Sequence, residues 1–460
     1  MAIIGAVADD LTGATTVGVL LARSGIATAA FFNENCAMSG NCNLNYEAII
    51  VSTNSRGITK EKAMEKVKIA TSNLKKMGIR QFSKRIDTTL RGNIGEEIDA
   101  MLDELGTDTV AVMVPSMPQS NRIMVGGYSM INGVPLSKTP VSRDVRTPVT
   151  DSYVPRLISS QTKRKVSYIS LDELLQGREN LKKTMKRFRE DGSEILLVDA
   201  ISLDDVEMIA YAVVELDWNV LAVDPGPFTE KIAIAKGFRK GRIKKTFQME
   251  INNDKFYGTG TVLVVAGSAS SVTITQIKKL RNVPETCQVP VKAQLLLPGG
   301  DSSDLEIERV SKSVREILGE FNVPRVIILE TALSGGVLDL RTESEKYGIS
   351  PEEAADNINL GLGEITREIL DKDGNKIKGL YMTGGDVMVY VCASLGVEGI
   401  ELIDYVIPQS DLGRFIGSNF NGMTIVGKGG LTGSDEIAIN IVNRIFYEEE
   451  CKKECDSCIK

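Results

Sequence analysis

The chain has 460 residues, of which 42% are hydrophobic and 25% are charged, a composition typical of a globular protein with roughly two domains and not of a disordered one. Its 54 basic and 61 acidic residues give a formal charge of −7, which provides no general attraction for nucleic acid or for an anionic membrane. We therefore expect a small molecule as the partner, and neither nucleic acid nor a membrane.

Short apolar segments alternate with helical segments through the first half of the chain. Residues 59–77 place a stripe of apolar side chains opposite lysines, with Gly78 directly after, which predicts an amphipathic helix. Residues 115–165 contain three proline-bearing stretches with little periodicity, and we interpret them as a functional excursion. Strands are predicted near residues 2–8, 27–32, 47–52, 80–86, 109–114, 165–170, 194–199 and 219–224.

The sequence turns basic and polar near residues 239–256, and strands then alternate with helices again. We place a boundary here, which gives domains 1–245 and 246–460. Helices are predicted at 352–370 and 435–449. Strands are predicted in "TVLVVAG" (261–267), "VIILETA" (326–332), "GLYMTGGD" (379–386), "IELIDYVIP" (400–408) and "MTIVGKGG" (423–430). The predicted fold class is α/β, with two domains that each hold a mostly parallel sheet flanked by helices, and with the active site in the cleft between them.

The expected location is the cytoplasm. The sequence contains no run of about eighteen or more apolar residues, and its first residues read as a strand without a basic leader. We therefore expect neither a membrane span nor a signal peptide. Seven cysteines, an odd number, indicate reduced thiols instead of a disulfide framework.

Two observations limit the chemistry that is available. Cys451, Cys455 and Cys458 are spaced C-x3-C-x2-C but lack a local fourth ligand, so we favour a frayed polar end over a zinc site and leave metal binding open. The chain has no histidine. Any general base must then be Asp, Glu, Lys, Tyr, Cys or water, which excludes a Ser-His-Asp hydrolase and a histidine-dependent dehydrogenase.

Two adjacent acidic residues mark the end of the first predicted strand. In "IIGAVADDLTGATTVG", residues 3–18, a run of small apolar residues is followed by Asp9 and Asp10 and then by a helix. Open α/β sheets bind ligands at the carboxyl ends of their strands. Carboxylates at that place can accept hydrogen bonds from hydroxyl groups of a substrate.

Cationic side chains follow two other strands of the first half. "SKRIDTTLRGNIGEE", residues 83–97, is rich in polar and cationic groups, and "STNSRG" places Arg56 at another strand end. A solvated turn in which Asn93 caps a helix is the simpler interpretation. The density of cations favours a site for a substrate carboxylate. Together with the acidic pair, the pattern indicates a polyhydroxy acid as the ligand.

Three segments of the second half run from a strand through small residues into a helix: "TVLVVAGSAS", "YMTGGDVMVYVCASLG" and "MTIVGKGGLTGSDEIAINIV". Backbone N–H groups at such helix starts can converge on an anion. One such loop is weak evidence for phosphate binding, and three in one domain are moderate evidence. Gly422, Gly427 and Lys428 match the spacing of a P-loop, but Gly429 stands where Ser or Thr would hold magnesium, so we predict only a glycine nest with Lys428 beside it.

Together these residues resemble the four-carbon acid sugar kinase family, formerly a domain-of-unknown-function family, whose members phosphorylate threonate, erythronate or 3-oxo-tetronate with ATP. The resemblance spans essentially the whole chain. It is carried by "ADDLTGA" (8–14), "KRIDTTLRGN" (84–93), "PSMPQSNR" (115–122), "GVPLSKT" (133–139), "VAGSAS" (265–270), "TGGD" (383–386) and "GKGG" (427–430). The first two motifs are specific and the glycine loops are not. Thr88 and Val387 depart from the family pattern, so the substrate is left open.

The resemblance implies a substrate-binding first domain, a nucleotide-binding second domain, and ATP with Mg²⁺ as cofactors. By motif, the implied substrate site contains Asp10, Arg56, Lys84, Arg85, Ile86 and Asp87, to which the strand-end argument adds Asp9. The implied ATP site contains Ser268, Gly384, Gly385, Asp386 and Gly430, to which the glycine nest adds Gly427 and Lys428. Metal ligands are not assigned. A homodimer is one assembly that we consider, although the sequence does not specify the oligomeric state.

The predicted mechanism is in-line transfer of the γ-phosphoryl group of ATP to a hydroxyl of a short sugar acid. Arg56, Lys84 and Arg85 would hold the acid, and Asp10 and Asp386 are equally weighted candidates for the base. One alternative is a nucleotide-regulated binding protein without turnover. A dinucleotide-dependent oxidoreductase is a weaker alternative, because no strand–G-x-G-x-x-G–helix with a following acidic residue is present.

Overall fold

A computed structural model describes residues 2–35, 45–144, 146–238, 256 and 258–458. The chain divides into two units, one made of Met1–Lys245 with Gly399–Asp404 and the other of Thr246–Glu398 with Tyr405–Lys460. The boundary predicted between residues 245 and 246 lies outside the described residues. The predicted cleft between the two domains stays a prediction.

A parallel sheet forms the centre of the first unit, and the strands predicted in the first half of the chain are confirmed. Their order is β2-β3-β1-β4-β11-β5-β10-β9. The bounds are β1 Ile4–Ala8, β2 Thr28–Phe31, β3 Ala48–Ser52, β4 Gln81–Arg85, β5 Thr109–Met113, β9 Val166–Ile169, β10 Ile195–Val198 and β11 Asn219–Asp224. Because all these pairings are parallel, the carboxyl ends of the strands lie at one edge of the sheet.

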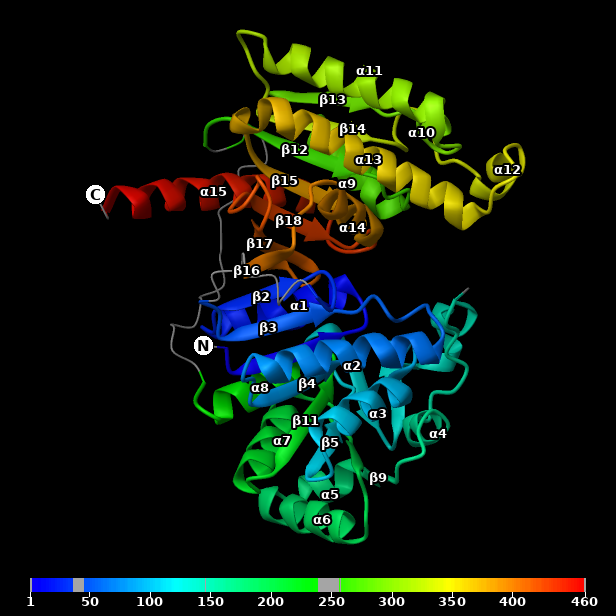
Figure 1. Cartoon of the computed structure of the whole chain (residues 1–460), viewed down its shortest axis with the longest axis vertical. Helices are drawn as coiled ribbons and strands as arrows, with labels where there is room; N and C mark the ends of the chain where they lie inside the picture. Colours follow the sequence, from blue (N-terminus) through cyan, green and yellow to red (C-terminus); the bar gives the residue numbers. More distant parts are fainter. Residues whose placement is uncertain (1, 36–44, 145, 239–255, 257, 459–460) are drawn as a thin grey trace. The chain divides into compact units, whose positions relative to one another are not determined.

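Helices cover this sheet in two groups. Helices α2 (Lys60–Lys76) and α3 (Ile94–Leu105) pack against each other, as Figure 1 shows. The other group contacts in the order α1-α8-α7-α6, with bounds α1 Leu11–Arg23, α8 Pro227–Ala235, α7 Leu203–Glu215 and α6 Arg178–Glu190. Two further short helices are α4 Val154–Ser159 and α5 Leu171–Leu175. The apolar stripe predicted on α2 is confirmed, since Ala63, Val67, Ala70 and Leu74 are fully buried.

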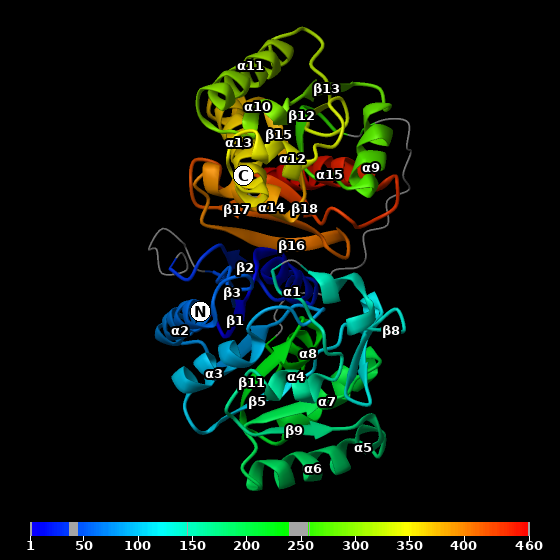
Figure 2. The same cartoon turned by 90° about the vertical axis from the view of Figure 1, so that its right-hand side faces the viewer.

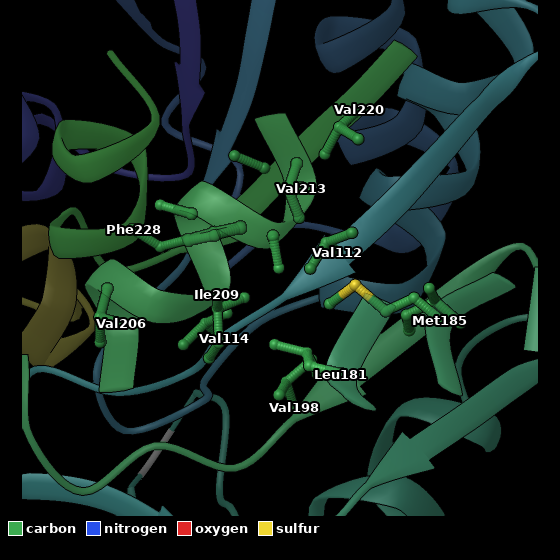
Figure 3. Packing of buried hydrophobic residues seen from close by; sticks show 14 of the residues in the cluster. Val112, Val114, Leu181, Met185, Val198, Val206, Ile209, Val213, Val220 and Phe228 are labelled. Carbon is green, nitrogen blue, oxygen red and sulfur yellow. The ribbon is translucent and has the colours of Figure 1, made fainter. Parts of the chain in front are cut away.

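Figure 3 shows how helices α6, α7 and α8 bury apolar side chains against strands β5, β10 and β11. Val112, Val198 and Val220 come from the strands, and Leu181 and Phe228 from the helices. Each of these side chains is fully or almost fully buried. Burying such a side chain stabilises the folded state by about 1.5–3 kcal/mol, so this cluster anchors the strands whose ends carry polar residues.

The segment 115–165, predicted as an excursion, contains a small antiparallel sheet. Its strands are β6 Arg122–Val125, β7 Tyr128–Ile131 and β8 Val134–Pro135. A bridge between Met124 and Ala200 connects this sheet to the chain that follows β10, and Figure 2 shows β8 at the side of the unit. The strands are short and half-buried, so their sequence lacks the long apolar runs that marked the others.

The second unit contains another mostly parallel sheet, in the order β13-β14-β12-β15-β18-β17. Strand β17 (Ser410–Ile416) is antiparallel to β18. The other bounds are β12 Thr261–Ala266, β13 Thr286–Pro290, β14 Val326–Glu330, β15 Ile377–Thr383 and β18 Thr424–Lys428. Strands β13 and β17 were not among those predicted.

Helices again form two groups around the sheet of the second unit. Helix α9 (Ser271–Arg281) packs on α15 (Ile437–Cys458). The other group, in mutual contact, contains α10 Ala293–Leu296, α11 Gly300–Leu318, α12 Leu340–Glu345, α13 Pro351–Asp373 and α14 Gly385–Ser394. The helices predicted at 352–370 and 435–449 are confirmed, and the α/β fold class with two domains is confirmed with them. No helix in the described part of the chain is both long and apolar enough to cross a membrane.

The first part of one strand of the second half, Gly399–Asp404, belongs to the first unit. Strand β16 spans Gly399–Ile407, and its first four residues pair antiparallel with β2, from Gly399 opposite Phe31 to Leu402 opposite Thr28. An ion pair between Arg23 and Asp404, at 2.7 Å, holds the same segment to α1. The sequence predicts the whole strand in the second domain, because an apolar run does not reveal which strand it will pair with.

Candidate active site

Three loops of the first unit bring the predicted substrate residues to one edge of the sheet. Strand β1 lies between β3 and β4, and all three run parallel. The residues that follow these strands therefore lie side by side: Asp9 and Asp10 after β1, Arg56 after β3, and the segment around Asp87 after β4. This arrangement is the one expected of a ligand site in an open α/β sheet.

Asp9 and Arg56 form a buried, two-pronged ion pair. Arg56 Nε lies 2.7 Å from Asp9 Oδ2, and Arg56 Nη2 lies 3.1 Å from Asp9 Oδ1. Burial would raise the pKa of Asp9, but the charges of Arg56, Lys84 and Arg85 outweigh it and hold that pKa below its usual range. Asp9 is therefore a charged anchor for Arg56 within the protein.

Asp10 has a different role from its neighbour. Its Oδ1 accepts a hydrogen bond of 2.7 Å from the Gly13 backbone N–H, which makes it the N-cap of α1. Its Oδ2 lies 2.7 Å from Arg56 Nη1, and its Oδ1 lies 3.2 Å from Arg85 Nη1. The Asp10 side chain is 24% exposed and that of Asp9 is 5% exposed. Of the two carboxylates, Asp10 is the one that a ligand can reach.

Lys84 points into the interior of the first unit. Its Nζ lies 2.6 Å from Glu97 Oε2 and donates a 3.0 Å hydrogen bond to the Arg85 carbonyl, and the residue is 1% exposed. Glu97 Oε1 accepts a 2.7 Å hydrogen bond from Ser55 Oγ. Burial raises the pKa of Glu97. Lys84 therefore holds the loops together from the interior of the unit. Ile86, two residues further along, is a buried apolar residue.

Sequence reasoning missed Glu97, although a signal was present. Consecutive residues of a strand point to opposite faces, so Lys84 and Arg85 cannot both face the substrate. The lysine that faces inward needs a buried carboxylate, and Glu97 lies in the first turn of α3, which follows the same loop.

Asp87 connects the loop after β4 to the excursion. Arg91 Nε lies 2.7 Å from Asp87 Oδ2, Thr89 hydroxyl also donates to that oxygen, and Arg91 Nη1 lies 3.3 Å from Asp144 Oδ2. Burial would raise the pKa of Asp87, but Arg56 and Arg91 lower it well below its usual range. Asp87 is therefore ionised. Asn93, predicted as a helix cap, precedes α3 but donates its side-chain N–H to the Ile58 carbonyl and makes no capping hydrogen bond.

The predicted nucleotide loops also meet at one sheet edge, in the second unit. Strands β12, β15 and β18 are parallel neighbours, so the loops after them are adjacent. Gly430 carbonyl accepts hydrogen bonds from Ser270 Oγ at 2.5 Å and from Thr273 Oγ1 at 2.9 Å. Gly384 N–H donates to the Lys428 carbonyl at 2.9 Å. The three loops are thus tied together by their backbones.

Two glycines are required by this geometry. Gly384, the N-cap of α14, has φ of +112°, a conformation that L side chains rarely adopt. A Cβ on Gly430 would lie 2.6 Å from Ser268 Oγ. A side chain at either position would disturb the arrangement of these loops.

Lys428 and Asp386 differ sharply in exposure. Lys428 is 2% exposed and its Nζ donates to the Gly429 carbonyl at 2.7 Å and to the Thr432 carbonyl at 3.2 Å, so it closes its own loop. Burial lowers the pKa of Lys428 to about 8. Asp386 is exposed in the first turn of α14, and among the described residues no ion pair or hydrogen bond engages its carboxylate.

A cavity of about 120 Å³ lies beside these loops in the second unit. Gly267 and Ala269, which follow β12, form one wall, and apolar residues such as Val337, Leu338 and Ile358 form others. Two larger hollows, of about 460 and 600 Å³, are lined by residues at the amino ends of the strands, such as Thr261 and Ile377. They lie at the opposite edge of the sheet from the glycine loops.

The described residues contain no group of three or more His, Cys, Asp or Glu side chains arranged to hold a metal ion. Cys451 is a free thiol within α15. The side chains of Cys455 and Cys458 lie outside the described residues, so metal binding by these three cysteines stays open.

Comparison with known proteins matches both halves of the chain. Residues 4–232 match a family described as "Sugar-binding N-terminal domain", and residues 263–438 match "Nucleotide-binding C-terminal domain". The chain is 39% identical over 446 residues to a D-erythronate kinase of Heliobacterium modesticaldum, and the aligned region covers 96% of each chain. The chain belongs to the four-carbon acid sugar kinase family.

A second named kinase and a solved structure are also similar to this chain. A D-threonate kinase of Salmonella typhimurium is 27% identical over 96% of this chain and 98% of its own. A solved structure from Haemophilus influenzae has the same fold, with a TM-score of 0.74 at 21% identity over 96% of this chain and all of that one. The family predicted from the sequence is confirmed, and with it the prediction of a kinase.

The Asp9–Arg56 pair should contribute strongly to stability. We expect Asp9→Asn to destabilise the first unit by about 3–5 kcal/mol, because it leaves the Arg56 charge buried without its main partner. Asp10→Asn is the matched control, since asparagine caps a helix as effectively as aspartate and position 10 is partly solvated. Urea unfolding followed by the fluorescence of Trp218, the single tryptophan of the chain and part of the first unit, measures both.

The pH dependence gives a second test of this pair. The pKa values of Asp9 and Asp87 are lowered in the folded state, so their stabilising contribution is complete above the unfolded value of about 4 and is lost as the pH falls through the folded values. The difference in stability between the wild type and Asp9→Asn should therefore shrink below about pH 4. A difference that stays constant down to pH 2 would contradict the assignment.

Gly384 offers a test of the nucleotide loops. We expect Gly384→Ala to weaken ATP binding in calorimetry on the order of 10-fold or more, because the strained backbone moves N–H groups away from phosphate. Gly396→Ala is the control: this glycine also has positive φ, of +61°, but lies at the other end of α14. Equal losses of ATP affinity in both variants would show that strain, and not the loop, is responsible.

Proposed function

We propose that the protein transfers the γ-phosphoryl group of ATP to a hydroxyl group of a four-carbon sugar acid, with D-erythronate as the first candidate. The observation that carries the proposal is the network of Asp9, Asp10 and Arg56 at the ligand edge of a unit whose family is described as sugar-binding. The name of the relative at 39% identity supports the choice of acid.

On the substrate side, we assign hydroxyl recognition to the accessible carboxylate of Asp10. Arg56 and Arg85 fix the orientation of that carboxylate through contacts of 2.7 Å and 3.2 Å. A sugar acid presents several hydroxyl donors, and an oriented carboxylate accepts hydrogen bonds from them strongly. Asp9, Lys84, Ile86 and Asp87 would then support the site from within the protein, while Arg85 keeps a place beside the ligand.

On the nucleotide side, we assign the phosphates of ATP to the loops around Gly384, Gly385 and Gly430, with Ser268 beside them. The N-terminus of α14 supplies backbone N–H groups and a favourable dipole for phosphate. Gly427 and Lys428 hold the third loop in shape. The apolar cavity bounded by Gly267 and Ala269 suits the adenine base, since flat apolar walls bury a heterocycle next to a phosphate site.

Magnesium would accompany ATP and neutralise charge on the phosphates during transfer. Magnesium sites of this kind commonly use one or two carboxylates together with phosphate oxygens and water. Asp386, exposed on the α14 loop, is the carboxylate that could take part. A cytoplasmic location and a homodimer stay predictions.

We propose Asp386 as the general base and Asp10 as an orienting group, although the sequence weighted them equally. A base needs a lone pair that is free to take the proton of the attacking hydroxyl. The oxygens of Asp10 already face Gly13 N–H, Arg56 and Arg85, whereas the Asp386 carboxylate has no such partners among the described residues.

A screen for ADP release tests the function itself. Purified full-length protein is given ATP and Mg²⁺ with D-erythronate, D-threonate or 3-oxo-tetronate in turn. We expect ADP release to depend on the acid, and to be fastest with D-erythronate. Acid binding in calorimetry without any ADP release would instead favour a nucleotide-regulated binding protein. A dinucleotide-dependent oxidoreductase would instead change the absorbance of a nicotinamide cofactor, which ATP turnover does not do.

Two asparagine variants test the division of roles. Asp386→Asn should lower kcat by about 10²–10⁴-fold with little change in the KM of the acid, since the proton acceptor is lost. Asp10→Asn should raise the KM of the acid with a smaller fall in kcat. A titration of Mg²⁺ is the control: if Asp386 binds the metal and is not the base, the variant will need more Mg²⁺ and regain rate. A large fall in kcat for Asp10→Asn, with a raised KM for Asp386→Asn, would make Asp10 the base and Asp386 the orienting group.

A further inference from the structure

Arg122 is a half-buried arginine at the ligand edge of the first unit that lacks a carboxylate partner. It opens β6 and follows the loop that begins directly after β5. Strand β5 is parallel to β11, which is parallel to β4, so this loop leaves the sheet at the same edge as Asp87. The charge of Asp87 raises the pKa of Arg122 against the larger lowering by burial, in keeping with the position of both residues at this edge.

Four other cations of this edge already have carboxylate partners within the protein. Arg56 pairs with Asp9 and Asp10, and Arg85 lies 3.2 Å from Asp10. Arg91 pairs with Asp87 and Asp144, and Lys84 pairs with Glu97. A substrate carboxylate that bound any of these would have to compete with a fixed protein carboxylate.

Arg122 differs from them in what its nitrogen atoms contact. Its Nη1 donates to the Ser120 carbonyl at 2.9 Å. Its Nε is fully buried without a hydrogen-bond partner, as is that of Arg85, but unlike Arg85 it has no carboxylate within ion-pair distance among the residues that the structure describes. A buried N–H without an acceptor is unfavourable, so a ligand that uncovers Nε on binding would satisfy a donor that the protein leaves without a partner. Burial lowers the pKa of Arg122 below its usual value, and the charge of Asp87 opposes this shift only in part.

We propose that Arg122 binds the carboxylate of the sugar acid, through the face of the guanidinium that carries Nε and Nη2. That face presents two parallel N–H groups, a geometry that matches the two oxygens of a carboxylate. The inference rests on the proposed function and deepens it, because it assigns the acid end of the substrate to the excursion 115–165 and leaves the hydroxyl end to Asp10. It also replaces the sequence-based expectation that Arg56, Lys84 and Arg85 hold the acid.

A charge-deletion experiment with matched substrates tests this assignment. Arg122→Met keeps an unbranched apolar stem and removes the charge and the N–H donors. The KM and kcat of ADP release are measured with D-erythronate and with its primary amide, which lacks the negative charge, and the KM of ATP is measured alongside. Arg143→Met is the control, because Arg143 is an exposed arginine of the same excursion. Arg122→Lys keeps the charge but not the paired donors.

We expect Arg122→Met to raise the KM of D-erythronate on the order of 30-fold or more, with the KM of ATP unchanged. For the amide, the wild type and Arg122→Met should have the same KM, since neither can form the ion pair. Arg122→Lys should fall between the wild type and Arg122→Met, and Arg143→Met should match the wild type.

Two outcomes would overturn the proposal. An equal loss with the acid and with the amide, seen mainly in kcat, would mean that Arg122 contacts the transferred phosphoryl group or has only a structural role. An unchanged KM of D-erythronate in Arg122→Met would mean that another group binds the carboxylate. Failure of the proposed function is distinguishable from both, because the wild type itself would then release no ADP with any four-carbon acid.

Discussion

The buried ion pair between Asp9 and Arg56 is the interaction on which the first unit's site depends. Removing two charges from water is costly, and the cost is offset only when geometry and further hydrogen bonds are good. Here one guanidinium lies 2.7 Å from Asp9, 2.7 Å from Asp10 and 3.9 Å from Asp87. Because Arg56 follows β3 and the three acids follow β1 and β4, a single side chain fixes three loops relative to one another. The site is therefore shaped before any ligand arrives, which lowers the entropy lost on binding.

In the second unit, hydrogen bonds to backbone groups, instead of ion pairs, fix the loops relative to one another. Its three loops are joined through the carbonyls of Gly430 and Lys428. Neutral donors suit phosphate, because they bind the anion without a fixed opposite charge. A fixed opposite charge would slow the release of ADP. Carboxylates suit a sugar, since they accept from hydroxyl groups. The contrast between the two units thus follows from the chemistry of the two ligands.

The parts of the fold set by local patterns could be predicted from the sequence, and the parts set by distant partners could not. Parallel strands buried on both faces read as apolar runs, so β1 and β4 and the polar residues after them were found. The pairing of Gly399–Leu402 with β2 was not, because a strand's partner is not encoded in its own residues. Lys84 shows the same limit within the site. A lysine at a strand end predicts an anion as its partner, but that partner is the protein's own Glu97 and not a substrate. Arg122 lies in a recognised motif, yet only the structure distinguishes an arginine without a carboxylate partner from four cations that have one.

The electrostatic problem of this enzyme explains why a free donor matters. The chain carries a formal charge of −7, and both ATP and a sugar acid are anions, so the field of the whole protein does not draw substrates in. Attraction must therefore come from short-range contacts in places where water is excluded and charge interactions are stronger. In the first unit, however, the cations nearest to Asp9 and Asp87 are paired with acids, which leaves the edge close to neutral. A neutral, rigid site discriminates by geometry: it accepts the ligand whose carboxylate reaches an unsatisfied guanidinium while its hydroxyl groups reach an oriented carboxylate. An acid of a different length could satisfy one end but not both, so the spacing between the two ends, and not net charge, would set the substrate.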